Sequence, residues 1–398
     1  MRSGSRALPL IIISQFCCTS LWFASNGVMD DLLNAFALSK DALGYLTSAV
    51  QFGFIFGTLC FALLTIADRY SPSRVFMFSA FFGALFNMLT VLEGNTVITL
   101  GTLRFLTGFF LAGIYPVGMK IAADYHQKGL GKALGYLVGA LVVGTALPHL
   151  LKGLTEGLSW KIVLLTTSLL AILGGLLTGC FVKDGPFRKA MSKMELSVVP
   201  KIFKNRSFSA AALGYFGHMW ELYAFWAFVP FMFTTFVNDH PESFIHVPIS
   251  SFVVIGIGGV ACVLSGYISL GSGPKKTAIA ALALSGLCCF LSPFVLSSDS
   301  SWLLIIFLLF WGMVVIADSP MFSTLVAQSA EPETKGTALT IVNCIGFAIT
   351  IVSIQLLNGL AGVLSANYLY LFLGIGPIFG LVAIVKQVPK SSFNRYQA

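Results

Sequence analysis

Residues 302–327 read WLLIIFLLFWGMVVIADSPMFSTLVA, and in this stretch Asp318 is the single ionisable side chain. A helix needs about 20 predominantly apolar residues to cross the hydrocarbon core of a bilayer. A surface helix of a soluble protein is apolar on one face only, whereas this stretch is apolar on nearly every side. The stretch therefore predicts a transmembrane helix, and it sets the class of the whole protein.

Similar runs recur along the chain, which predicts an all-α membrane protein with twelve transmembrane helices. Most connections are only a few residues long, so neighbouring helices must run antiparallel. The predicted spans are 8–29, 41–67, 75–92, 97–123, 131–151, 160–182, 208–237, 247–270, 277–296, 302–327, 336–362 and 366–385.

The composition supports this class. Charged residues make up 10% of the 398 residues and apolar residues 57%, whereas soluble proteins carry about 25% charged residues. So few charges cannot coat a soluble globule, which excludes a soluble enzyme, a nucleic-acid binder and a disordered chain. The eight cysteines lie in apolar runs without metal-ligand spacing, so we expect no disulfide framework, metal site or cofactor.

The distribution of positive charge predicts the orientation. All but four of the 24 lysines and arginines fall on the side of the two termini; the exceptions are Lys40, Lys152, Lys161 and Arg104. Cytoplasmic loops are rich in lysine and arginine. We therefore expect both termini in the cytoplasm and, from the short loops, a bacterial inner (plasma) membrane. The N-terminus is similar to a signal peptide but lacks a cleavage site, so it is interpreted as the first span.

The two halves of the chain look like copies of each other. Pro116 in the fourth span corresponds to Pro320 in the tenth at an offset of 204 residues, and Gly131-Lys132-Ala133-Leu134 matches Gly336-Thr337-Ala338-Leu339 one residue further on. We predict a six-helix bundle over 1–182, a polar and basic cytoplasmic linker over 183–206 and a second six-helix bundle over 207–398.

At this point the sequence resembles the major facilitator superfamily over essentially its whole length. The loop 67–74, ADRYSPSR, is similar to the family signature G-x-x-x-D-R-x-G-R-[RK], although Leu64 replaces its glycine and the final arginine is shifted. Arg104 to Gly108 matches the family's R-x-x-x-G motif, and the fifth span only partly matches the glycine-proline motif of drug antiporters.

The resemblance implies a secondary transporter that works by alternating access, with its substrate near the midplane between the halves. In such a protein the loop residues Asp68, Arg69 and Arg74 are candidate gating residues, because paired charges at helix ends can hold the halves together. The alternative is that they simply anchor a short inner turn.

Polar residues in the first span are candidates for binding the substrate. Trp22, Asn26 and Asp30 follow Gln15 and Thr19 at spacings that place them on one helix face. Such a face must contact protein or a water-filled cavity. Asp30 and its neighbour Asp31 have a second interpretation, as the solvated outer end of the helix.

Arg104 in the fourth span stays charged and so needs a partner. Either a carboxylate of the first helix, Asp30 or Asp31, or a substrate anion can supply it. Two further residues complete the candidate binding set, Trp220 in the seventh span and Asn343 in the eleventh.

Ionisable residues in the seventh and tenth spans are candidates for proton coupling. His218 and Glu221 are three residues apart and are predicted to share a helix face as a titrating pair, with a structural hydrogen bond as the alternative. Asp318 precedes Ser319-Pro320 near mid-span. Two ligands are too few for a metal site.

These residues favour a proton-coupled transporter of a small organic solute, with an anion among the candidates because of Arg104. The alternative is a proton-coupled drug or cation efflux pump, with metal export ranked lower. An enzyme is not expected, because no nucleophile and base occur at a recognisable spacing. The expected partners are the solute, protons and the lipid bilayer, and the chain is expected to work as a monomer.

Overall fold

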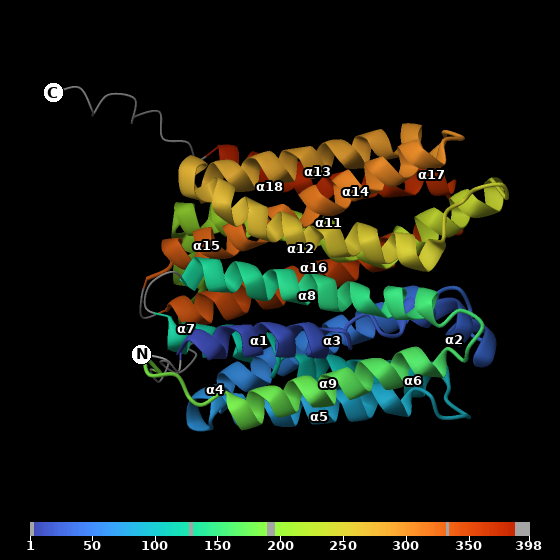
Figure 1. Ribbon diagram of the computed structural model, residues 1–398. Helices are drawn as coiled ribbons and strands as arrows, with labels where there is room; N and C mark the ends of the chain where they lie inside the picture. The colour runs from blue at the N-terminus through green and yellow to red at the C-terminus, as the bar shows by residue number, and fades with distance from the viewer. Residues whose placement is uncertain (1–3, 127–129, 189–195, 332–333, 387–398) are drawn as a thin grey trace.

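The computed structural model describes residues 4–126, 130–188, 196–331 and 334–386. Figure 1 shows a bundle of long helices, with α1 to α9 (blue to green) in the lower part and α11 to α18 (yellow to red) in the upper part. The α-helices are α1 Gly4–Thr19, α2 Met29–Ala35, α3 Ala42–Leu63, α4 Ile66–Arg69, α5 Pro72–Leu89, α6 Val97–Leu111, α7 Tyr115–Tyr125, α8 Leu130–Leu154, α9 Lys161–Phe181, α10 Val199–Lys204, α11 Arg206–Asp239, α12 Val247–Ser272, α13 Pro274–Leu296, α14 Ser301–Ala317, α15 Ser319–Ser329, α16 Lys335–Leu360, α17 Ala366–Leu369 and α18 Ile375–Val385. Three short 3-10 helices are η1 Asn26–Val28, η2 Leu196–Val198 and η3 Tyr370–Gly374.

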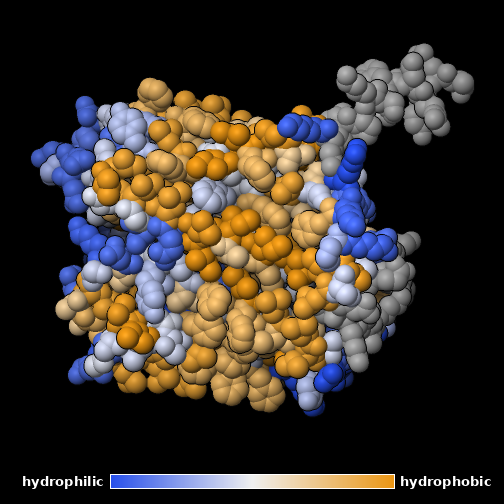
Figure 2. Space-filling view, turned by 180° about the vertical axis from the view of Figure 1, so that it is seen from behind, coloured by the Kyte–Doolittle hydropathy of each residue, from blue (hydrophilic) through white to orange (hydrophobic). Residues whose placement is uncertain are grey.

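The prediction of an all-helical membrane protein is confirmed. Eleven helical segments of the described chain are long and apolar enough to cross a membrane, and Ala7–Thr19 is a shorter apolar helix. On the face shown in Figure 2, a broad hydrophobic region occupies the middle of the molecule, and hydrophilic residues gather at its two ends. Below, the end at which α3 begins is called the outer end and the opposite one the inner end, after the predicted orientation.

Five of the predicted spans are interrupted. In the second, α3 ends at Leu63 before α4, and the twelfth divides into α17, η3 and α18. The predicted helix over 8–29 was wrong as a continuous element, because α1 ends at Thr19 and residues 20–25 form turns before η1. The fourth span divides into α6 and α7, and the tenth into α14 and α15. Pro116 and Pro320 lie in the first turn of α7 and α15. The N–H groups of a first turn have no partner within the helix, so a proline there costs no hydrogen bond.

Corresponding glycines in the two halves allow equally close helix crossings. A Cβ atom on Gly108 of α6 would lie 2.0 Å from the carbonyl oxygen of Val50 in α3. A Cβ atom on Gly312 of α14 would lie 2.1 Å from that of Val254 in α12. Gly312 follows Gly108 by 204 residues, and Val254 follows Val50 by the same number. This is also the offset between the two prolines. The boundaries at 182 and 207 stay a prediction, and 189–195 of the linker lie outside the described residues.

Replacing Gly108 by alanine is expected to destabilise the protein by about 1–3 kcal/mol, because the new methyl group meets backbone that cannot rotate away. The measurement is the melting temperature of the detergent-purified protein. Gly266→Ala is the matched control, since no atom lies within 4 Å of its added Cβ. An alanine in this helix interior should be neutral or stabilising. Equal melting temperatures for the two variants would contradict the close crossing.

The two halves meet along two helix pairs, α8 with α12 and α3 with α16. At the first, Gly139 and Gly259 lie against each other, and a Cβ on Gly139 would be 3.1 Å from the Gly259 carbonyl oxygen. At the second, Gln355 Nε2 donates to Ser48 Oγ at 2.8 Å. The first span packs against these pairs through α1 and α8, and α11, which carries His218, Trp220 and Glu221, packs against α16 and α12.

Candidate functional site

Arg104 closes the break in the first span. Its side chain is 1% exposed, and its guanidinium donates to the carbonyl oxygens of Leu21, at 3.0 Å, and of Trp22. Among the described residues no backbone N–H donates to either carbonyl. The carboxylate partners predicted for Arg104 were therefore wrong: the turn at residues 20–25 frees backbone acceptors, and these lie closer than the carboxylates at the outer end.

The aspartates after the break lie at the outer surface. Asp31 pairs with Lys152 of α8 at 2.6 Å, and Asp30 is exposed in the first turn of α2. The helix break has moved Asp30 off the face that Trp22 and Asn26 were predicted to share with it. The alternative interpretation of the aspartates, a solvated helix end, is the one that the structure supports.

A buried histidine–aspartate contact connects the seventh and tenth spans. His218 Nδ1 of α11 lies 2.7 Å from Asp318 Oδ1, and the two side chains are 1% and 0% exposed. Asp318 is the residue between α14 and α15, so the break in the tenth span positions its carboxylate. Within the described chain, His218 Nε2 and Asp318 Oδ2 have no hydrogen-bond partner.

Glu221 faces a different set of helices, so the predicted His218–Glu221 pair was wrong. Its carboxylate accepts from Trp311 Nε1 at 2.6 Å, Ser285 Oγ at 2.9 Å and Cys289 Sγ at 3.4 Å. These donors come from α13 and α14. Residues three apart on a helix diverge by about 60°, which here is enough to direct the two side chains to different neighbours.

Aromatic rings from both halves meet in the centre of the bundle. The ring of Trp22 lies 4.7 Å from that of Phe54, 5.8 Å from Tyr223 and 5.6 Å from Phe347. Trp22 and Phe54 belong to the first half, and Tyr223 and Phe347 to the second. We call these four residues the central ring cluster.

Polar side chains of α3 support the broken segment of the first span. Trp22 Nε1 donates to Gln51 Oε1 at 3.2 Å, and Asn26 Nδ2 donates to Thr47 Oγ1 at 2.9 Å. Sequence reasoning missed Thr47 and Gln51. Their four-residue spacing within an apolar run was the available signal, because it places both on one helix face.

The two remaining candidates of the binding set lie in the second half. Trp220 Nε1 donates to the carbonyl oxygen of Phe372 in η3 at 2.9 Å, so this ring is directed away from the central ring cluster. Its predicted role in binding is not supported, since the carbonyl of the neighbouring helix already accepts its only polar hydrogen. Asn343 Oδ1 accepts from Tyr215 at 2.9 Å.

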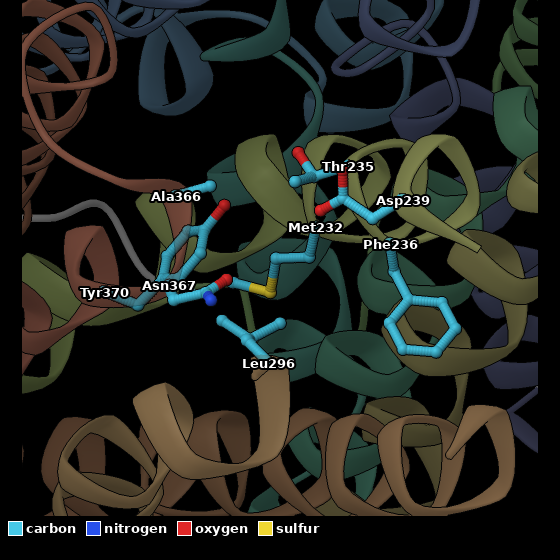
Figure 3. Close-up of a pocket in the computed structure, with 8 residues that line it drawn as sticks. All are labelled: Met232, Thr235, Phe236, Asp239, Leu296, Ala366, Asn367 and Tyr370. Atoms are coloured by element: carbon cyan, nitrogen blue, oxygen red, sulfur yellow. The ribbon is translucent and has the colours of Figure 1, made fainter. Parts of the chain in front are cut away.

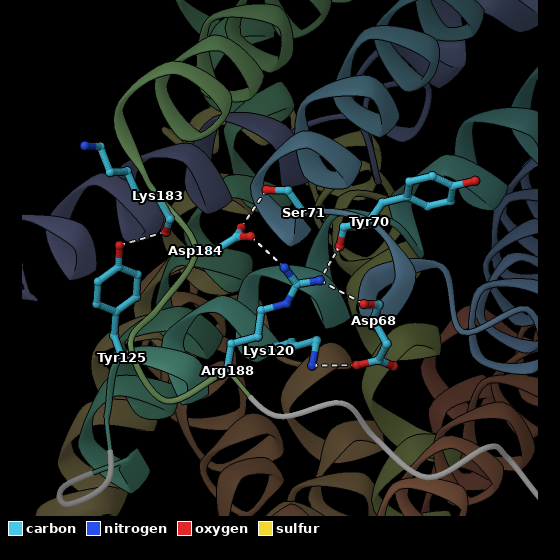
Figure 4. A network of polar contacts seen from close by, with 8 residues as sticks. All are labelled: Asp68, Tyr70, Ser71, Lys120, Tyr125, Lys183, Asp184 and Arg188. Atoms are coloured by element: carbon cyan, nitrogen blue, oxygen red, sulfur yellow. Dashed lines mark hydrogen bonds and ion pairs between the residues drawn. The ribbon is translucent and has the colours of Figure 1, made fainter.

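The loop with the family signature is part of a polar network at the inner end (Figure 4). Asp68 pairs with Lys120 of α7 at 2.9 Å. Arg188 donates to the carbonyl oxygens of Asp68 and Tyr70 at 2.8 and 2.7 Å and to the carboxylate of Asp184 at 2.6 Å. Asp184 also accepts from Ser71.

Two of the predicted gating residues lie outside this network. Arg69 donates to Thr65 in its own turn, and Arg74 is exposed. The contacts that the structure gives for the loop hold it to α7 and to the chain after α9. Gating through Asp68, Arg69 and Arg74 therefore stays a prediction.

The outer ends of the two halves are joined by polar contacts. His246, which precedes α12, lies 2.8 Å from Glu156 Oε2 after α8. Asn358 Nδ2 of α16 donates to the Asp41 carbonyl oxygen at 3.4 Å. Together with the hydrogen bond of Gln355 to Ser48, these contacts join the two halves near the outer end.

The Glu156 contact is expected to depend on the outer pH. The hydrogen bond from His246 lowers the pKa of Glu156 below its ordinary value of 4.5. The contact therefore stabilises the protein at neutral pH and is lost as the pH falls through this lowered pKa. We expect a small loss of melting temperature in Glu156→Gln at pH 7 that is absent at an acidic pH below this lowered pKa.

Glu93→Gln is the matched control for this change, because Glu93 pairs with Lys161 at the outer end within one half, at 3.6 Å. A difference between wild type and Glu156→Gln that is the same at both pH values would contradict the assignment.

A small pocket at the outer end of the second half is too small for a solute. Figure 3 shows its side chains, and its cavity volume is ≈ 10 Å³, about one water. Its lining residues are Met232, Thr235, Phe236, Asp239, Leu296, Ala366, Asn367 and Tyr370. In the described chain no cluster of three or more His, Cys, Asp or Glu residues could hold a metal ion.

Comparisons with known proteins agree with this architecture. A family model described as Major Facilitator Superfamily matches residues 11–354. The fold is similar to that of the proton:xylose symporter XylE, with a TM-score of 0.74 and 12% identity over 97% of this chain and 96% of that chain. It is also similar to an inward-facing, unoccupied bacterial homologue of the human lysosomal transporter Spinster, with a TM-score of 0.71 and 14% identity over 97% and 96% of the two chains.

Curated relatives match shorter parts. A D-galactonate transporter of Escherichia coli O6:H1 is 30% identical over 203 residues, which are 48% of this chain and 44% of the relative. The putative uncharacterized transporter YgaY of Escherichia coli K12 is 26% identical over 42% of each chain. The efflux pump FUBT of Fusarium oxysporum is 27% identical over 38% of this chain and 26% of the pump. The chain thus spans less than half the length of each of these relatives.

Proposed function

This chain belongs to the major facilitator superfamily, and on that premise we propose that it is a proton-coupled transporter of a small organic solute. The family makes it a multi-pass secondary transporter and not an enzyme. The coupling, the solute and the roles of individual residues are our proposal. The observation that carries it is the buried contact of His218 and Asp318 at the break of the tenth span.

The location of this pair fits a proton carrier. Charged groups within a membrane are costly, and they occur mainly where function needs them. When Asp318 takes up a proton, its contact with His218 loses any charge–charge attraction, and the junction of α14 and α15 is held to α11 less strongly. Among the described residues, His218 Nε2 and Asp318 Oδ2 have no hydrogen-bond partner. Each of these atoms can therefore accept a proton or bind a water molecule.

Glu221 is a second candidate for the coupling proton. Three donors surround its carboxylate, so its negative charge is better satisfied than that of Asp318. We assign Glu221 to holding α11 against α13 and α14, and the first proton-accepting role to Asp318.

For the transport cycle, we propose that residues 1–182 and 207–398 move as two units about the contacts of α8 with α12 and of α3 with α16. The outer contacts, among them that of His246 with Glu156, must open to admit solute from outside. The inner network around Asp68 is the candidate for the opposite gate. We place the protein in the inner (plasma) membrane as a monomer with cytoplasmic termini, supported by the distribution of lysine and arginine.

Efflux of a drug-like or cationic solute is the second candidate function. The central ring cluster favours it, because aromatic faces accommodate apolar rings and attract organic cations. The relative described as an efflux pump is consistent with it.

The test is proton flux in proteoliposomes that contain the purified protein and an internal pH-sensitive dye. D-galactonate and D-xylose are the first probes, followed by a cationic dye such as ethidium. Addition of a transported solute outside should acidify the interior if solute and proton enter together, and make it alkaline if they exchange. Solute uptake without any pH change would disprove proton coupling.

A further inference from the structure

Several buried polar side chains around the break of the first span have no hydrogen-bond partner. Among the described residues these unsatisfied atoms include Gln51 Nε2, Trp226 Nε1, Thr145 Oγ1, His149 Nε2 and Ser25 Oγ, and Arg104 Nε at the same break has no partner either. Each of these residues is at most 2% exposed. A buried polar group without a partner is unfavourable, so this many in one region indicates that something else satisfies them.

The first two of these groups are connected through the central ring cluster. Gln51 Oε1 holds the indole N–H of Trp22, which leaves the amide N–H₂ of Gln51 free. The ring of Trp22 contacts Tyr223, whose ring lies 5.2 Å from Trp226. Trp226 also lies 6.3 Å from Phe23 in the break. The free donors thus come from both halves and adjoin the same rings.

Thr145 and His149 belong to α8, the helix that packs against α1 and η1 at the break. They are one turn apart, and the residues that precede them, Gly144 and Pro148, pack directly on the first span. A Cβ on Gly144 would lie 2.2 Å from Thr19 Oγ1, and one on Gly27 would lie 2.7 Å from Pro148. We call Gln51, Trp226, Thr145, His149 and Ser25 the neutral polar set.

Charged side chains of the bundle centre are engaged elsewhere. The guanidinium of Arg104 is used by two carbonyl oxygens, and Glu221 is held by three donors. His218 and Asp318 contact each other at 2.7 Å. The hydrogen bonds of Arg104 and Glu221 are thus largely satisfied by neutral groups, and apart from Arg104 Nε the unsatisfied atoms around the break belong to side chains other than Asp, Glu, Lys and Arg.

We propose that the neutral polar set and the central ring cluster bind an uncharged, hydroxyl-bearing ring compound, a neutral sugar or a nucleoside. Hydroxyl groups both donate and accept hydrogen bonds, so they match the mixed donors and acceptors of the set. The flat faces of the aromatic rings pack against the ring of the solute. This inference rests on the proposed transport function, but it concerns only which solute is bound.

The experiment is a thermal-shift titration of the detergent-purified protein with compounds that differ in charge. The sugar arm compares D-galactose with D-galacturonate and D-galactosamine, and the nucleoside arm compares uridine with its 5′-monophosphate. A ligand that binds only the folded protein raises its melting temperature in a concentration-dependent way. We expect stabilisation by galactose or by uridine and none by the charged compounds, and the arm that responds identifies the source.

Two variants test the neutral polar set, Gln51→Leu and the isosteric Thr145→Val. Each should weaken binding of the neutral compound about tenfold or more while the protein remains folded without ligand. Trp220→Phe is the matched control, since its indole donates to η3 away from the centre, and it should bind like wild type. If Gln51→Leu fails to fold, Thr145→Val decides.

Three results would overturn the inference: stabilisation by a charged compound alone, stabilisation by no neutral compound, or binding that both variants leave unchanged. Binding needs no pH gradient, so failure of proton coupling would be seen in the liposome assay and not here. A neutral ligand that binds without proton movement would disprove the coupling and keep the inference.

Discussion

Replacing Asp318 by asparagine is expected to abolish accumulation of the solute in response to a pH gradient. Asparagine keeps the shape of the carboxylate and an oxygen that accepts from His218, but it does not take up a proton. One coupled proton and a gradient of one pH unit supply about 1.4 kcal/mol, roughly tenfold accumulation of a neutral solute. In Asp318→Asn the internal concentration should rise only to the external one.

Exchange of labelled for unlabelled solute should continue in this variant, because exchange needs no net proton movement. The measurement is uptake in proteoliposomes with and without the gradient, using the probe that the flux screen identifies. His218→Gln should reduce accumulation as well. If the two effects arise from one pair, the double variant should be no worse than Asp318→Asn alone.

The chain offers a matched control for this pair. His240 and Asp299 also form a histidine–aspartate contact, at 3.1 Å, but it lies at the outer surface, where Asp299 is 96% exposed. Asp299→Asn should leave accumulation unchanged, because water solvates the charge in both states. Full accumulation in Asp318→Asn would remove Asp318 from the coupling mechanism.

Replacing Arg104 by alanine is expected to lower the melting temperature more than any other substitution considered for this protein. The change leaves the carbonyl oxygens of Leu21 and Trp22 without donors in the membrane interior and creates a cavity. Each hydrogen bond from a charged donor contributes about 1.5–3 kcal/mol, so the loss should be on the order of 3 kcal/mol or more. Lysine keeps the charge without the planar fork and should fall between alanine and arginine.

Lys152→Ala is the control for a charge removed from a less buried place. Lys152 pairs with Asp31 at the outer end, where both side chains are more than a quarter exposed, and an exposed pair contributes no more than about 1 kcal/mol. If Arg104→Ala melted like wild type and lost binding of an anion instead, Arg104 would be a substrate ligand and the neutral-solute inference would fail with it.

The helical membrane architecture followed from the sequence because it depends on local properties. Runs such as 302–327 are apolar over a membrane's thickness, and backbone in lipid must satisfy its own hydrogen bonds. The repeat of Pro116 and Pro320 showed that the fourth and tenth spans correspond, but both were predicted as continuous, and the structure breaks each of them shortly before its proline. The first span contains no proline near its break, and there periodicity predicted a continuous helix wrongly.

The candidate site was predicted in part. His218, Glu221, Asp318 and Arg104 were identifiable because an ionisable residue within an apolar run needs a partner. Their partners were not, because each lies on a helix distant in sequence. His218 pairs with Asp318 a hundred residues later, and Arg104 contacts carbonyl oxygens that become available only when α1 ends early.

The sequence by itself determined that this protein lies in a lipid bilayer, that it is all-helical and that its interior contains energetically costly charged side chains. These follow from hydrophobicity along the chain, which the bilayer acts on segment by segment. The tertiary structure decided how the charges are paired and which neutral groups remain unsatisfied. Hydrogen bonds and ion pairs act over about 3 Å, so they depend on which helices the close glycine crossings bring together.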